Sequence, residues 1–89
     1  DTEGFVNMGL QLKGICFSVI FIENAEDQMI KISFRSSGDF DVNTFARKHF
    51  NGGGHKNAAG GRSEQSLSET LAYFRSLLPD YLSTLKSHQ

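Results

Sequence analysis

The sequence predicts a small α/β domain in which helices cover a mixed β-sheet and a glycine-rich loop lies beside it. Two segments, residues 15–22 and 29–36, are rich in β-branched and aromatic residues, as strands are. Two later segments, residues 42–50 and 67–85, carry apolar residues at helical spacing. Strands followed by helices in this order favour a sheet with helices packed against it.

The chain is long enough for one hydrophobic core. It has 89 residues, of which 38% are apolar and eight are phenylalanine. A chain of this length folds as one domain, so residues 1–89 are expected to be a single domain. Its small size and the lack of an initiator methionine lead us to expect a fragment of a longer protein.

Cysteine and hydropathy indicate a reducing compartment and no membrane. Cys16 is the single cysteine, so an internal disulfide is excluded and a cytoplasmic location is expected. Because Cys16 lies in the apolar run 15–22, we expect a buried structural thiol. That run is far too short to span a bilayer, and the first residues show no signal-peptide pattern.

Positive charge is concentrated in the middle of the chain. The net charge is −1, yet residues 31–62 contain six basic and two acidic residues, a net +4. Such asymmetry suggests one anion-binding surface, although scattered solubilising charge would give the same count. The six basic residues are Lys31, Arg35, Arg47, Lys48, Lys56 and Arg62.

The first half of the chain is expected to form a hairpin. Residues 5–12 mix polar and apolar side chains and are expected to form an entry segment with a turn of helix. Residues 15–22 are apolar at nearly every position, which predicts a central strand buried on both faces. Residues 29–36 alternate, so that Ile32 faces the core while Ser33 and Arg35 face the other way.

The second half is expected to contain two helical regions with clear start signals. Asp41 can cap a helix over residues 42–50, which Asn51-Gly52 would end. A short strand is expected around residues 60–63. Ser66 and Glu69 form a capping box in front of a second helix, which Pro79 is expected to divide into two pieces.

Two features could bind an anion. Ser33 and Arg35 project to the same side of a strand, where a guanidinium and a hydroxyl can hold a phosphate or carboxylate. A merely solvated strand face is the alternative. In the glycine-rich loop Gly52, Gly53 and Gly54 could direct backbone N–H groups at an anion, and His55 would stand at its rim. A flexible linker is the alternative here.

The sequence gives little support for a known nucleotide-binding motif, a metal site or a catalytic site. The pattern of a P-loop is absent, and the glycines follow a helix, which argues against a Rossmann site. The three histidines and Cys16 lack the spacing of a metal site, so no metal ligand is expected in this chain. No paired carboxylates accompany a nucleophile, so no catalytic residue is assigned.

The segments DTEGFVN, SFRS and GGGHKNAAG, in this order, resemble the C-terminal DHH-associated domain of DHH-family phosphoesterases. The likeness is strongest to bacterial oligoribonucleases (nanoRNases) that also dephosphorylate 3′-phosphoadenosine 5′-phosphate. It implies that a separate DHH domain binds manganese and hydrolyses the phosphoester, and that this domain grips the substrate. It further implies a set of substrate contacts: Ser33, Arg35, Ser36, Gly52, Gly53, Gly54, His55 and Asn57. Phe5 and Asn7 are weaker candidates for such contacts.

The resemblance implies no cofactor in this domain and, as partners, short RNA or nucleotide phosphates and the DHH domain of the same chain. A homodimer of the parent enzyme would also fit. Two other functions stay open at this point. One is a non-catalytic RNA-binding module like the C-terminal domain of alanyl-tRNA synthetases, and the other is a structural or dimerisation domain. The isolated chain is expected to be inactive.

Overall fold

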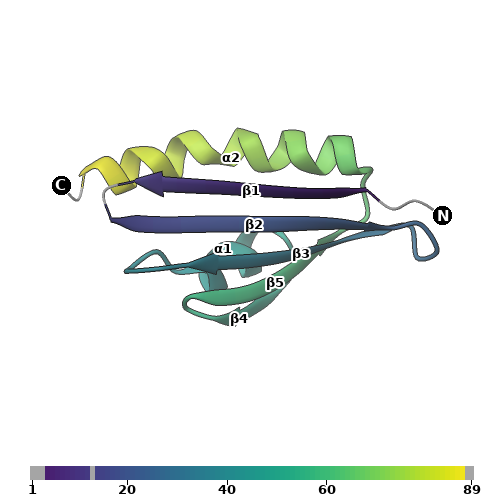
Figure 1. Cartoon of the computed structure of the whole chain (residues 1–89), viewed down its shortest axis with the longest axis horizontal. Helices are drawn as coiled ribbons and strands as arrows, with labels where there is room; N and C mark the ends of the chain where they lie inside the picture. Colours follow the sequence, from purple (N-terminus) through teal and green to yellow (C-terminus); the bar gives the residue numbers. More distant parts are fainter. Residues whose placement is uncertain (1–3, 13, 88–89) are drawn as a thin grey trace.

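The computed structural model describes residues 4–12 and 14–87, with side chains for 4–11 and 14–82. It contains one sheet and two helices (Figure 1). The elements are β1 (Phe5–Leu12), β2 (Ile15–Asn24), β3 (Met29–Ser36), α1 (Val42–His49), β4 (Gly53–His55), β5 (Ala58–Ser63) and α2 (Leu67–Ser87).

The strand order in the sheet is β1-β2-β3-β5-β4. The predicted α/β fold with helices packed on a sheet is confirmed. The sheet is antiparallel in all four of its strand pairings, however, where a mixed sheet was expected. In three of these pairings, β1 with β2, β2 with β3 and β4 with β5, the strands follow one another through short connections, which can only join antiparallel neighbours.

β1 is an element that the sequence analysis did not predict. Residues 5–12 form a strand along the edge of the sheet, paired with β2 from Phe5 opposite Ile22 to Leu12 opposite Ile15. The expected helical turn was wrong because the segment alternates with the period of a strand. Val6, Met8 and Leu10 pack against the core, and the residues between them face away from it.

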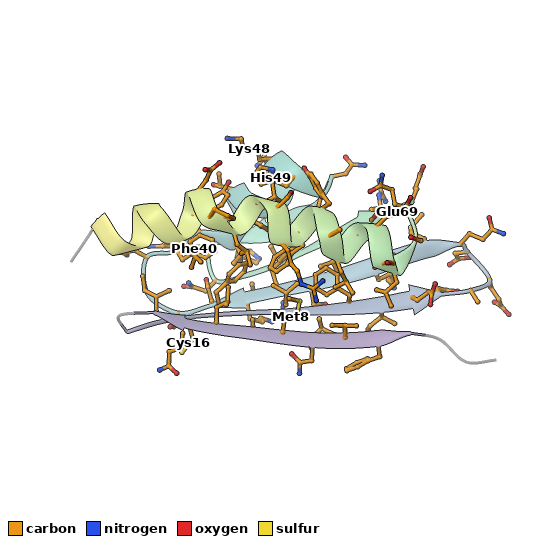
Figure 2. All side chains as sticks on the ribbon, turned by 90° about the horizontal axis from the view of Figure 1, so that it is seen from above. Met8, Cys16, Phe40, Lys48, His49 and Glu69 are labelled. Carbon is orange, nitrogen blue, oxygen red and sulfur yellow. The ribbon has the colours of Figure 1, made fainter. Side chains whose placement is uncertain are left out.

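The core lies on one face of the sheet only. Alternate side chains of β2 and β3 are buried there under α1 and α2, and Phe45 of α1 packs edge to face against Phe34 of β3. Figure 2 shows both helices on the same side of β1 and β2, with Cys16 on the other side. The buried strand residues are Phe17, Val19, Phe21, Ile30, Ile32 and Phe34.

The prediction that residues 15–22 are buried on both faces was therefore wrong. No helix of the described chain covers the face opposite the core, so Ile20 is only half-buried there and Ile22 is 37% exposed. The predicted alternation of β3 is confirmed, and Lys31 and Arg35 are exposed on this same face. We call it the open face.

Local capping signals position the helices as predicted. The Asp41 carboxylate accepts a hydrogen bond from the Thr44 N–H over 3.0 Å, which begins α1. The Ser66 hydroxyl accepts from the Glu69 N–H over 3.0 Å, while the Glu69 carboxylate accepts from the Ser66 N–H. Asn51 follows α1 in the left-handed conformation, with φ 53°.

α2 continues through Pro79, contrary to the expected division into two pieces. Proline in a helix interior removes one hydrogen bond and crowds the preceding turn. Leu78 and Tyr81 pack against the core on either side of Pro79, which keeps both halves in one line. Tertiary packing therefore overrides the local preference to break.

Candidate functional site

Arg35 and His55 lie in one line across the open face. Arg35 of β3 pairs with Ala58 of β5, and Ala58 pairs with His55 of β4. Paired residues of antiparallel strands project to the same side of a sheet. Because neighbouring strands lie about 4.8 Å apart, the two Cα atoms are roughly 10 Å apart, close enough for both side chains to reach one phosphate.

Both side chains keep free donors. The Arg35 Nη1 donates to the carbonyl oxygens of Phe34, over 2.8 Å, and of Ala59, over 3.5 Å. A guanidinium has five N–H groups, so most of them remain available. The His55 ring is exposed and makes no hydrogen bond or ion pair with any residue that the structure describes.

The surface between these two side chains is narrow and flat. Ala58 presents only a methyl group there. In the next row Ser33 of β3 pairs with Gly60 of β5, which in turn pairs with Gly53 of β4. A ligand can therefore approach the sheet backbone closely between Arg35 and His55. Ala58 and Gly60 form this floor, and neither was among the site residues expected from the sequence.

The predicted glycine loop is in fact part of a β-hairpin. Gly53–His55 forms the edge strand β4, and Lys56-Asn57 forms the turn to β5. The Gly54 N–H donates to the Asn43 side chain over 2.8 Å. The Gly52 N–H donates to the Ala46 carbonyl over 3.1 Å, so the backbone nest expected from the three glycines is absent from this described segment.

Close strand contact explains why the segment is glycine-rich. A Cβ atom on Gly52 would overlap the Gly60 carbonyl oxygen. A Cβ atom on Gly54 would lie 2.7 Å from the Ala58 carbonyl oxygen and 2.8 Å from the Ala59 Cα. These glycines let β4 approach β5, which places His55 on the open face.

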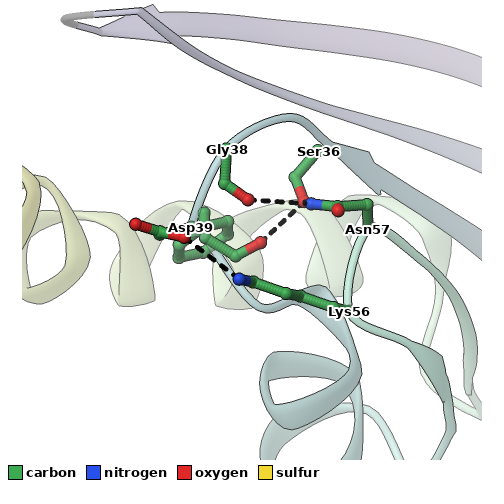
Figure 3. A network of polar contacts seen from close by, with 6 residues as sticks. Ser36, Gly38, Asp39, Lys56 and Asn57 are labelled. Carbon is green, nitrogen blue, oxygen red and sulfur yellow. Dashed lines mark hydrogen bonds and ion pairs between the residues drawn. The ribbon is translucent and has the colours of Figure 1, made fainter.

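Ser36 and Asn57 are brought together by a polar network (Figure 3). The Asn57 side-chain amide donates to the Ser36 hydroxyl over 2.9 Å and to the Gly38 carbonyl over 3.2 Å. The Ser36 hydroxyl donates to the Phe40 carbonyl over 2.7 Å. The network ties the β4–β5 turn to the segment after β3, so it braces the hairpin that carries His55 against the strand that carries Arg35.

An ion pair lies beside this network. The Lys56 ammonium is 3.0 Å from the Asp39 carboxylate, and both side chains are exposed (Figure 3). An exposed pair of this kind contributes roughly 0–1 kcal/mol, so it assists the hairpin only modestly.

Cys16 belongs to the open face and is exposed, so the expected buried thiol was wrong. It faces outwards because β2 is covered on one side only.

Two shallow hollows lie on the surface of the described chain. One of about 260 Å³ lies by the β2–β3 turn, away from Arg35, and one of about 200 Å³ adjoins Arg35. The second hollow is lined by Cys16, Ser18, Arg35, Ser36 and Ser37. Only the strand register could have revealed this grouping.

His49 lies away from the open face. It is half-buried between α1 and α2, and its Nε2 is 2.7 Å from the Tyr81 hydroxyl. Burial, with a smaller effect from Lys48, holds the pKa of His49 below its ordinary value of 6.5. Burial also raises the pKa of Tyr81. The contact between His49 and Tyr81 links the two helices and lies on the side of the sheet away from the open face.

Phe5 and Asn7, the weaker candidates, stand on the open face of β1, where Phe5 is 62% exposed. Asp1, Thr2 and Glu3 of the DTEGFVN segment lie outside the described residues.

Within the described part of the chain, no three His, Cys, Asp or Glu side chains gather as a metal site would require. Of the helices described, none is long and apolar enough to cross a membrane.

Comparisons with known proteins agree on one family. The family model described as the DHHA1 domain matches residues 1–84. A crystal structure of an exopolyphosphatase-related protein from Bacteroides fragilis matches 80% of this chain, with 45% sequence identity and a TM-score of 0.73. This chain spans 20% of the length of that protein. Among curated proteins, none matches.

Proposed function

The chain belongs to the DHHA1 domain family, and on that basis we propose that it is the substrate-binding domain of a DHH-family phosphoesterase. The proposed substrates are short oligoribonucleotides or 3′-phosphoadenosine 5′-phosphate. The reaction is the hydrolysis of a phosphoester, carried out by a DHH domain in the same polypeptide. The chain by itself would bind and not hydrolyse.

One observation carries this proposal: the alignment of Arg35 and His55 on the open face, with only Ala58 between them. A planar guanidinium binds two phosphate oxygens at once, and an imidazole can donate a further hydrogen bond. Ser33, one row away on the same face, could contact a ribose or the phosphate edge. Because Gly60 has no side chain, the ligand could approach the backbone of the sheet closely there.

In this proposal the chain's residues hold the substrate in register for the other domain. Arg35 and His55 would bind the phosphate next to the bond that is cut, and Ser36 and Asn57 would keep them at a fixed separation. Manganese in the DHH domain would supply an activated water and polarise the phosphoryl group. Correct positioning would then raise the reaction rate without any proton transfer by this chain.

The test is steady-state kinetics of the two-domain protein that contains this chain. The variant Arg35→Gln is expected to lower kcat/KM by tenfold or more, as the removal of a charge-assisted hydrogen bond of about 1.5–3 kcal/mol predicts. The control variant Lys48→Gln removes an exposed charge on α1 and should leave kcat/KM unchanged. Equal kcat/KM values for the Arg35→Gln and Lys48→Gln proteins would contradict the proposal.

A non-catalytic RNA-binding module is the competing function, and the same protein distinguishes it. Such a module would bind RNA tightly without the DHH domain. A substrate-binding domain would bind weakly alone, and its Arg35 variant would affect turnover. Full phosphoesterase turnover with Arg35→Gln, together with the abolition of RNA binding, would favour the module.

A further inference from the structure

Two basic residues that are not among the candidate substrate contacts lie opposite each other on the open face. Lys31 of β3 is paired with Arg62 of β5, and both side chains are exposed. They share the face of Arg35 because Lys31 and Arg35 are separated by an even number of residues along β3. Like charges directly opposite one another on neighbouring strands destabilise a sheet.

In the described part of the chain, no carboxylate forms an ion pair with either of these cations. Among the residues that the structure describes, the ion pair found is Lys56 with Asp39, in the segment beyond the other end of β3, and neither Lys31 nor Arg62 has an acidic partner. The neighbours of Lys31 across the sheet are apolar: Ile22 of β2 and, beyond it, Phe5 of β1. An exposed cationic pair without an internal counter-ion is a site that an external anion would stabilise.

The distance between the two cationic positions limits what that anion can be. Lys31 is four residues from Arg35, so their Cα atoms are roughly 13 Å apart along β3. A single phosphate group at Arg35 and His55 cannot also contact Lys31 and Arg62. On β3 and β5, the row between these two positions consists of Ser33 and Gly60, whose small side chains do not block a ligand that spans both. Two phosphates of one nucleotide chain can occupy both positions.

We propose that Lys31 and Arg62 form a second phosphate subsite, which binds a single-stranded oligonucleotide several nucleotides long as it runs along β3 and β5. This inference rests on the proposed function and extends it from one phosphate to a chain. Phe5, 62% exposed in the same row, offers an aromatic face on which a base can stack. The subsite makes affinity depend on substrate length.

The test is an NMR titration of the 89-residue chain at low salt. The probes are 3′-phosphoadenosine 5′-phosphate and 5′-phosphorylated oligoadenylates of two to five nucleotides. The double variant Lys31→Gln/Arg62→Gln is expected to raise the Kd of the pentamer tenfold or more and to change the Kd of the mononucleotide less than twofold. The salt slope for the pentamer should fall by about 0.7, the value for the one phosphate that the variant no longer neutralises.

The matched control is Lys48→Gln/Arg75→Gln, which removes two exposed charges from the helices and should leave both Kd values unchanged. An unchanged pentamer Kd in the Lys31→Gln/Arg62→Gln chain would overturn the second subsite, as would an equal rise in the Kd of the control. If Arg35→Gln also leaves the mononucleotide Kd unchanged, the proposed function itself fails. The absence of any binding by the unmodified chain would contradict both.

Discussion

The Asn57 side-chain amide donates a 2.9 Å hydrogen bond to the Ser36 hydroxyl, across 21 positions of sequence. Ser36 ends β3, one residue after Arg35, and Asn57 lies in the turn that follows His55. Together with the 3.0 Å hydrogen bond from the Ser36 N–H to the Asn57 carbonyl, it ties the strand that carries Arg35 to the hairpin that carries His55. In the proposed function, Ser36 and Asn57 would therefore act as positioning residues for Arg35 and His55.

Replacing Gly54 by alanine is expected to lower the free energy of unfolding by about 1–3 kcal/mol, as overpacking does. The new Cβ atom would lie 2.7 Å from the Ala58 carbonyl oxygen, so β4 would have to move away from β5. Urea unfolding measures the change. The control is Gly9→Ala, where nothing lies within 4 Å of the added Cβ atom. Equal stabilities of the two variants would show that β4 does not pack as described.

Replacing Asp41 by alanine is expected to destabilise the domain because the Thr44 N–H loses its capping acceptor. That hydrogen bond is the main reason that the pKa of Asp41 lies below its ordinary value of 3.8. The contribution is therefore fully present above pH 3.8 and is lost as the pH falls through the lower pKa of the folded protein.

Unfolding curves of the unmodified and Asp41→Ala chains between pH 7 and pH 2 check this. The gap between them should close at acid pH. Asp39→Ala, which breaks only the exposed pair with Lys56, serves as control and should change the stability little at any pH. A gap for Asp41→Ala that persists at the lowest pH would contradict the capping role.

His49 is expected to make stability fall on mild acidification. Its pKa in the folded protein is lowered by burial between α1 and α2, so the unfolded chain takes up a proton first as the pH falls through about 6.5. The unmodified chain should therefore lose stability relative to His49→Gln between pH 7.5 and pH 5.5. Because all other groups are shared, the difference between the two unfolding free energies isolates His49. A difference that does not vary with pH would refute this prediction.

Local signals in the sequence predicted the elements that local chemistry determines. The alternation of residues 29–36 correctly placed Ser33 and Arg35 together on the face away from the core. The caps at Asp41 and Ser66 begin the helices where expected because a side chain and a backbone N–H three residues on suffice to form them. The strand β3 and the starts of α1 and α2 were thus accessible from sequence.

The remaining features depend on contacts between distant residues. β4 has almost no side chains, and only its fit against β5 and Asn43 makes Gly53–His55 a strand. The exposure of Cys16 depends on which face of the sheet the helices cover, and this is not encoded in residues 15–22. The alignment of Arg35 with His55 depends on the register of three strands. Only the alternation of residues 5–12 was available in the sequence and went unused.

The central claim is that the open face binds a nucleotide phosphate through Arg35 and His55. The most direct measurement is an NMR titration of the chain with 3′-phosphoadenosine 5′-phosphate, followed at the backbone amides of every strand and helix. We expect saturable shifts centred on Arg35, His55 and Ala58, which Arg35→Gln abolishes. Shifts centred on α1 and α2, or unchanged binding by the Arg35→Gln chain, would contradict this claim.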